Sequence, residues 1–165
     1  MKIDKIKIFD EKFKDNKSKF VFQCILATLT ILAVLLFLDI LTEIAIITSL
    51  GASTMIAFTM PHKYTAASRR IIGGYIVGTV TGLVFYYLTF FVPTELDIIV
   101  FAAIAVGFSI FIMTMINVEH APAAGVALGL VIQNWNHMTI IYIVAAVLWM
   151  VIVKTLLRNW MIDLT

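Results

Sequence analysis

Small, polar and helix-breaking residues interrupt two otherwise apolar stretches of this chain. The first stretch carries Thr48-Ser49-Leu50-Gly51-Ala52-Ser53-Thr54, and the second carries His120-Ala121-Pro122-Ala123-Ala124-Gly125. Proline suits the first turn of a helix, where its missing N–H group has no partner to lose. The second pattern therefore predicts a helix that begins near Pro122, with the amides of Ala123, Ala124 and Gly125 as free donors.

Free donors at a helix start indicate anion binding. The unpaired N–H groups and the helix dipole both favour negative charge, most strongly where the dielectric constant is low. If a second half-helix began at Ser49 or Gly51, two such ends would face one another. We predict a site for a small anion, or for the acidic end of a small molecule, formed by Ser49, Gly51, Ala52, Ser53, Thr54, His120, Pro122, Ala123, Ala124 and Gly125.

The same small residues also have a purely structural interpretation, because they let helices approach closely in lipid. Two rows recur at four-residue spacing: Ser49, Ser53 and Ala57, and then Ala121, Gly125 and Gly129. The sequence leaves packing and site formation open for both rows. For Gly74, Gly78 and Gly82 we predict packing, either within the chain or between subunits, so a homo-oligomer is one expectation.

Ionisable side chains stand next to the second stretch. Glu119 and His120 are adjacent, and an ionisable group at membrane depth is a functional candidate. The ordinary pKa of histidine lies near 6.5, so His120 could bind an anion when protonated or couple to protons; its alternative role is that of a polar interface or cap residue. The accessory candidates are Glu119, Asn117, His62, Lys63 and Arg70, of which the basic ones either mark topology or form a vestibule that concentrates anions.

Metal and catalytic chemistry find little support. The three histidines, His62, His120 and His137, lack metal-site spacing, and neither a G-x-S-x-G elbow nor a P-loop occurs. Cys24 stands alone in an apolar segment and reads as a small hydrophobe. We expect no cofactor, no metal and no enzymatic activity. The alternatives are an intramembrane enzyme or redox protein that uses Glu119 and His120, and a structural subunit docked through the glycine row.

The amino-acid composition indicates what surrounds these apolar segments. Of 165 residues, 62% are hydrophobic and 13% charged, and the mean hydropathy is +1.04. Soluble domains are about 25% charged. A soluble fold of this size has no interior that could hide so much apolar side chain, so the lipid bilayer is the predicted partner. Nucleic acid is not expected, because no basic domain follows the lysine-rich start.

Hydropathy and charge predict an all-α bundle of about six membrane segments. The segments are 20–38, 44–60, 71–92, 98–116, 121–132 and 139–157, with the second and fifth short or broken. Six crossings place every Lys and Arg on one side, including the arm 1–19, and Asp39, Glu43, Glu95 and Asp97 on the other. We therefore expect a cytoplasmic arm 1–19, a membrane domain 20–158, a short cytoplasmic tail 159–165, and location in the inner (plasma) membrane. A re-entrant fifth segment is the alternative to a full crossing.

Six crossings divide into two sets of three with opposite orientation, a pattern shared by many secondary transporters. The unusual segment is the second one of each set. Short or Gly/Pro-interrupted segments at matching positions indicate a binding site near the membrane midplane.

The order of these motifs resembles the HPP family of integral membrane proteins. The likeness rests on Gly51-Ala52-Ser53, Pro61, Arg70-Ile71-Ile72-Gly73-Gly74 and His120-Ala121-Pro122-Ala123-Ala124-Gly125, and it covers about 20–157. Ala121 replaces the middle residue of the His-Pro-Pro motif, whereas Pro122, which the helix start uses, is kept. Family members are commonly described with about four membrane helices. The resemblance implies a transporter of nitrite or a similar small anion.

Overall fold

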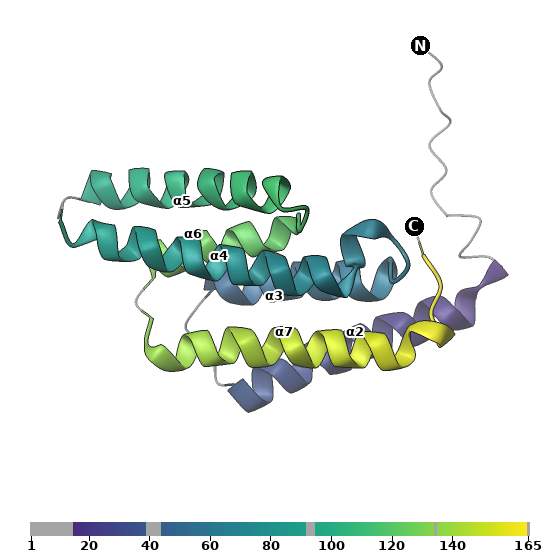
Figure 1. Cartoon of the computed structure of the whole chain (residues 1–165). Coiled ribbons are helices and arrows are strands. Elements are labelled where there is room, and N and C mark those ends of the chain that lie inside the picture. The colour runs from purple at the N-terminus through teal and green to yellow at the C-terminus, as the bar shows by residue number, and fades with distance from the viewer. Residues whose placement is uncertain (1–14, 39–43, 92–94, 134, 165) are drawn as a thin grey trace, which may run out of the picture.

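The computed structural model describes residues 15–38, 44–91, 95–133 and 135–164. These residues form helices and no strands. The α-helices are α2 (Lys17–Leu38), α3 (Ile44–Thr59), α4 (Ser68–Thr89), α5 (Glu95–Met115), α6 (Ala121–Ile132) and α7 (His137–Leu157), as Figure 1 shows. Two single-turn 3-10 helices, η1 (Tyr64–Ala66) and η2 (Arg158–Trp160), follow α3 and α7. The predicted all-α bundle is confirmed; most of the lysine-rich arm, Asp39 and Glu43 lie outside the described residues.

Helix length separates two classes of element. α2, α4, α5 and α7 are long and apolar enough to cross a membrane. α3 and α6 have 16 and 12 residues, or about 24 and 18 Å at 1.5 Å per residue, against about 30 Å of hydrocarbon. Large apolar side chains such as Leu36, Phe111 and Leu156 are exposed on the outside of the bundle. Lipid is the solvent that such a surface requires.

α3 is one continuous helix, so the predicted half-helix start at Ser49 or Gly51 is wrong. The hydroxyl groups of Thr48 and Thr54 donate to the carbonyls of Ile44 and Leu50, one turn earlier on the same helix. Hydroxyls that are satisfied in this way need no break in the backbone ladder. The shortness of α3, rather than an interruption, distinguishes it from the long helices.

The Lys and Arg side chains of the described helix ends gather at one end of the bundle, which we call the basic end. There α3 ends, α4 begins and α7 ends, and the C-terminus of the chain lies there too (Figure 1). Residues 161–164 are docked at this end. Leu164 donates its amide to the Thr59 carbonyl at 2.7 Å, and the Gln23 side chain binds the carbonyls of Phe58 and Ile162 at 2.6 and 2.8 Å.

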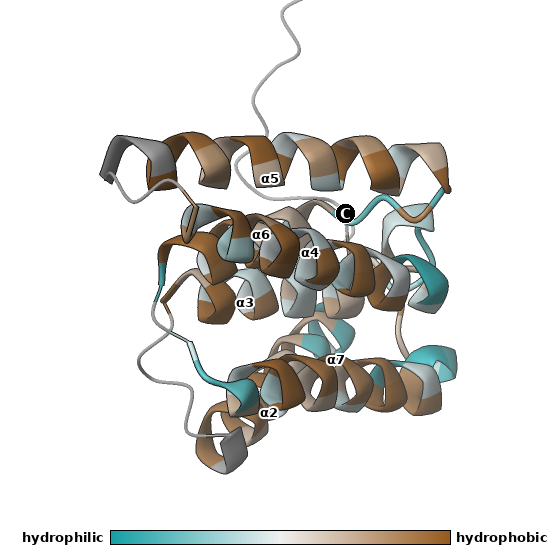
Figure 2. Ribbon diagram, turned by 60° about the vertical axis from the view of Figure 1, so that its left-hand side comes forward, coloured by the Kyte–Doolittle hydropathy of each residue, from teal (hydrophilic) through white to brown (hydrophobic). Residues whose placement is uncertain are grey.

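The two short helices occupy the middle of the bundle. α5 lies on one side, α2 and α7 lie on the other, and α3, α4 and α6 are between them (Figure 2). α3 packs on α2, α6 and α7, while α6 packs on α5, α3 and α4. The helix pairs that pack together correspond between the two halves of the chain. α2 packs on α3 as α5 packs on α6, α2 packs on α7 as α5 packs on α4, and α3 packs on α7 as α6 packs on α4. The described helices therefore have matching neighbours in the two halves.

Gly74, Gly78 and Gly82 of α4 pack against another helix of the same chain, which is one of the two kinds of packing that the sequence predicted. A Cβ on Gly78 would lie 2.2 Å from the Ala123 carbonyl oxygen, and one on Gly74 would lie 2.6 Å from the Cβ of His120. Gly82 meets Ala127 in the same way. Small residues thus let α4 run directly against α6, which fixes the turn that carries His120.

Candidate functional site

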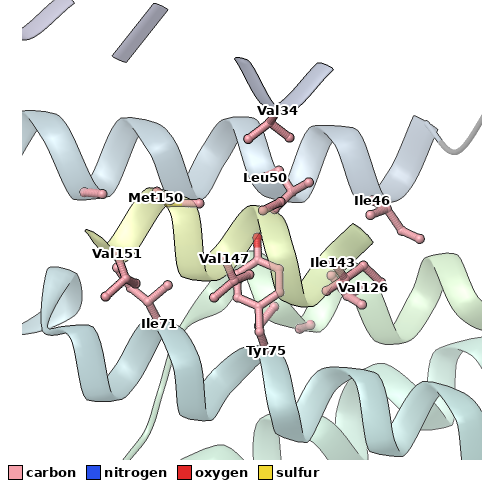
Figure 3. Packing of buried hydrophobic residues seen from close by; sticks show 14 of the residues in the cluster. Val34, Ile46, Leu50, Ile71, Tyr75, Val126, Ile143, Val147, Met150 and Val151 are labelled. Carbon is pink, nitrogen blue, oxygen red and sulfur yellow. The ribbon is translucent and has the colours of Figure 1, made fainter. Parts of the chain in front are cut away.

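Three polar side chains from three elements meet inside the bundle. The hydroxyl oxygen of Ser53, on α3, lies 2.7 Å from Nε2 of His120 and 2.8 Å from the hydroxyl of Tyr75, on α4. Their exposed fractions are 0%, 2% and 3%. Figure 3 shows Tyr75 reaching from α4 among the apolar core residues Leu50 and Val147. A polar group in such a core must hydrogen-bond within the protein, and the two hydroxyl groups and Nε2 of His120 do so with one another.

α6 begins where the sequence predicted, at Ala121, with Pro122 in its first turn and His120 at the N-cap. No side chain caps this helix start. The amide of Ala123 donates to the His120 carbonyl at 2.9 Å, and the amides of Ala124 and Gly125 belong to the helical ladder. The prediction of three free amides is therefore wrong, because the helix starts one residue before Pro122 and its own turns use them.

Ser49 joins α3 to the same helix start. Its hydroxyl donates to the Pro122 carbonyl at 2.7 Å, and a Cβ on Gly125 would lie 2.4 Å from that hydroxyl oxygen. Ser49, Ser53, His120, Pro122 and Gly125 are thus brought together, and the four-residue spacing serves both packing and site formation.

Apart from Ala124, the remaining predicted residues lie elsewhere. A Cβ on Gly51 would meet nothing within 4 Å, and Ala52 is exposed. The hydroxyl of Thr54 is used by its own helix. Ala123 packs against Gly78, and Ala124 lines a cavity beside the helix start. Sequence adjacency placed these residues in the predicted site, but on a helix consecutive residues point in different directions.

Nδ1 of His120 is the polar atom of this cluster that Ser53 and Tyr75 leave without a hydrogen bond. This nitrogen is buried and forms no hydrogen bond of ordinary length among the described residues, and a weak hydrogen bond with the Thr65 backbone acts on the ring. His120 lies in the turn between α5 and α6, outside the helical spans, and burial lowers its pKa to about 4, with a smaller opposing effect from the Thr65 backbone. The imidazole is therefore neutral near pH 7. When Ser53 donates to Nε2, the proton sits on Nδ1 and makes that atom a donor.

A cavity adjoins this helix start. It measures about 220 Å³, lies between α5 and α6, and is lined by Ile110, Met113, Thr114, Glu119, His120, Ala121 and Ala124. Most of its wall is apolar, so a small ligand there would depend on the few polar groups at its α6 side.

The accessory candidates form a separate network nearer the basic end. Arg70 binds the carboxylate of Glu119 and the amide oxygen of Asn117, and its guanidinium lies 3.1 Å above the ring of Tyr64. Tyr64 donates to the same Asn117 oxygen at 2.6 Å. Asn117 has a φ of 60°, in the left-handed region that asparagine tolerates. Glu119 therefore pairs with Arg70, and its carboxylate serves a different network from the His120 ring.

His62 and Lys63 line a second cavity, of about 240 Å³, at the basic end. Its wall is made by Pro61, His62, Lys63, Tyr64, Ala67, Ser68, Lys154, Thr155 and Arg158. Sequence reasoning used Lys154 and Arg158 as topology markers alone. The same reasoning missed Tyr75, although a polar residue inside a predicted span, next to two glycines, is a signal for an interior position. No group of three potential metal ligands occurs in the described part of the chain.

Comparison with known proteins gives one match. The family model described as HPP, transmembrane region, matches residues 13–162, which is nearly the whole chain. Neither a curated protein nor a solved structure matches.

Proposed function

The chain belongs to the HPP family of membrane proteins, and from this membership and the site geometry we propose that it transports a small inorganic anion such as nitrite. The anion binds at the start of α6, beside His120. One observation supports this most: a buried nitrogen without a hydrogen bond of ordinary length, at an uncapped helix start, next to a cavity.

A relay of hydrogen bonds prepares this nitrogen for an anion. In the tautomer that the proposal requires, Tyr75 donates to Ser53, Ser53 donates to Nε2 of His120, and Nδ1 then presents its proton. The positive end of the α6 dipole adds attraction at the same place. The neutral ring avoids a buried charge while the site is empty, which would otherwise be costly in a low dielectric.

The cavity at the basic end adjoins the entrance of the proposed route. Lys63, Lys154 and Arg158 attract anions there. η1 lies between this cavity and His120, because Tyr64 and Ala67 line the cavity and the Thr65 backbone acts on His120. We infer that η1, held by the Arg70 network, is the inner gate.

The matching neighbours of the two halves support an inverted repeat. An inverted repeat provides two equivalent arrangements of the same halves, which open the site to opposite sides in turn. By the positive-inside rule the basic end faces the cytoplasm, and the membrane is the inner one. The proposal involves neither catalysis nor a cofactor.

Nitrite uptake into liposomes that contain the purified protein tests this function. Wild type should take up nitrite above protein-free liposomes, with saturation, and nitrate or formate should compete. A hydrogen bond to a charged ligand is worth about 1.5–3 kcal/mol, so His120→Ala should weaken the apparent affinity by about 10- to 150-fold. The matched control is His137→Ala, on an exposed histidine at the other end of the bundle.

Two results would contradict the proposal. The first is the absence of nitrite, nitrate and formate uptake by a protein whose helical content and thermal transition are intact. The second is an equal response to His120→Ala and His137→Ala.

A further inference from the structure

The basic-end cavity is lined by a buried cation, Lys154, and an exposed one, Arg158. Lys154 is 3% exposed, and its ammonium group donates to the Ala66 carbonyl. Among the described residues the ion pair found is Arg70–Glu119, so no carboxylate neutralises Lys154. Arg158 lies one turn later on the same helix face and donates through Nε to His62. The nearby acid, Asp163, accepts from the His62 amide instead.

The first turn of α4 adds donors to this cavity. Ala67 and Ser68 line it, α4 begins at Ser68, and no side chain caps that start. The amides of Arg70 and Ile71 donate to the Ala67 carbonyl. This leaves the amides of Ser68 and Arg69 without a partner within the helix. A buried ammonium, an exposed guanidinium and a bare helix start in one cavity match the oxygens of a phosphate group.

A separate apolar groove lies farther along the same two helices. It measures about 340 Å³ and is lined by Ile72, Tyr75, Ile76, Thr79 and Val80 of α4 and by Ile143, Val144, Val147 and Leu148 of α7. On α4, Ser68, Ile72 and Ile76 follow at four-residue spacing, so cavity and groove share one helix face. Ile76 and Val144 are 58% and 50% exposed, so the groove opens toward lipid.

We propose that α4 and α7 bind one anionic phospholipid, with its phosphate in the basic-end cavity and an acyl chain in the groove. Charge complementarity selects the headgroup, and the apolar groove selects a lipid over a free phosphate. The cavity lies at the ends of two membrane-spanning helices, which is the depth of the headgroup layer. An acyl chain in the groove contacts the ring of Tyr75, whose hydroxyl binds Ser53.

Native mass spectrometry of the full chain, released from nanodiscs of mixed phosphatidylglycerol and phosphatidylcholine, tests this site. Wild type should retain one phosphatidylglycerol in preference to phosphatidylcholine. One cationic residue near a headgroup contributes about fivefold in affinity, so Arg158→Gln should reduce retention by about that factor. Arg69→Gln is the matched control, because Arg69 lies at the same end, donates to the Ile116 carbonyl and does not line the cavity.

A second variant tests the groove without touching a charge. Val144→Trp fills the lipid-facing groove and should abolish retention of phosphatidylglycerol, while circular dichroism confirms the fold. Three results would overturn the proposal. The first is equal retention of the two lipids, and the second is displacement of phosphatidylglycerol by millimolar inorganic phosphate. The third is that the lipid is lost only under conditions in which the chain forms a dimer. The last result would assign the groove to a second copy. None of these readouts depends on nitrite uptake.

Discussion

Ser53 is the residue on which the account depends most, because one hydroxyl links α3, α4 and the turn before α6. Its two partners, Tyr75 and His120, come from positions that are distant in the sequence. A serine that satisfies two buried groups fixes the orientation of the His120 ring, and thereby the direction in which Nδ1 points.

Two glycines of the predicted site should respond differently to the same change. Gly125→Ala places a Cβ 2.4 Å from the Ser49 oxygen, which breaks the Ser49–Pro122 hydrogen bond. We expect nitrite uptake to fall about tenfold, the effect of about 1.4 kcal/mol. Gly51→Ala meets nothing within 4 Å and should leave uptake unchanged. Equal effects of the two variants in liposome uptake would show that the site includes the other face of α3.

The charge state of His120 gives a pH prediction. Burial lowers its pKa to about 4, so the ring stays neutral as the pH falls through the ordinary histidine value of 6.5. Nitrite affinity should therefore show no step between pH 8 and pH 5.5. A rise in affinity centred near pH 6.5 that is absent in His120→Ala would instead indicate binding by a protonated ring.

At the scale of elements, the close approach of α4 and α6 positions the site. Gly78→Ala drives a Cβ to within 2.2 Å of the Ala123 carbonyl oxygen, so the helices must separate. Overpacking of this kind costs about 1–3 kcal/mol, and the thermal transition in detergent should fall. The matched control is Gly107→Ala on α5, where a Cβ meets nothing within 4 Å. A Gly78→Ala protein as stable as the control would mean that this helix contact is not required.

The length of apolar runs explains why the elements could be predicted. α6 has the predicted bounds 121–132, and α3 differs by one residue at its end, because lipid solvates apolar runs and their polar flanks stop them. The continuity of α3 could not be read in the same way. Gly51 and its neighbouring hydroxyl residues are compatible with a broken or an intact helix, and hydrogen bonds to carbonyls one turn earlier decide for the intact one.

The membership of the site was predictable in part, for a geometric reason. Ser49, Ser53, His120 and Gly125 were predicted because of their spacing and chemistry, and the structure brings them together. Tyr75 was missed because its role depends on which face of α4 meets α3 and α6. That choice is made by Gly74 and Gly78, whose contacts are tertiary and do not appear in a single helix pattern.

At the scale of the whole molecule, topology carries the transport proposal. In the proposed topology of six crossings, the basic end lies in the cytoplasm. In a Cys24→Ser background, Lys63→Cys should react with a membrane-impermeant thiol reagent only after intact cells are opened. Reaction from the outside of intact cells would reverse the orientation and the assignment of η1 as the inner gate.

The central claim is that a small anion binds Nδ1 of His120, and ¹⁵N NMR of histidine-labelled protein in nanodiscs tests it directly. The chain has three histidines, so His62→Ala and His137→Ala assign the signals. Titration with nitrite should shift the Nδ1 signal of His120 and leave that of His137 in place. A saturating titration that moves only His62, or no histidine, would contradict the account.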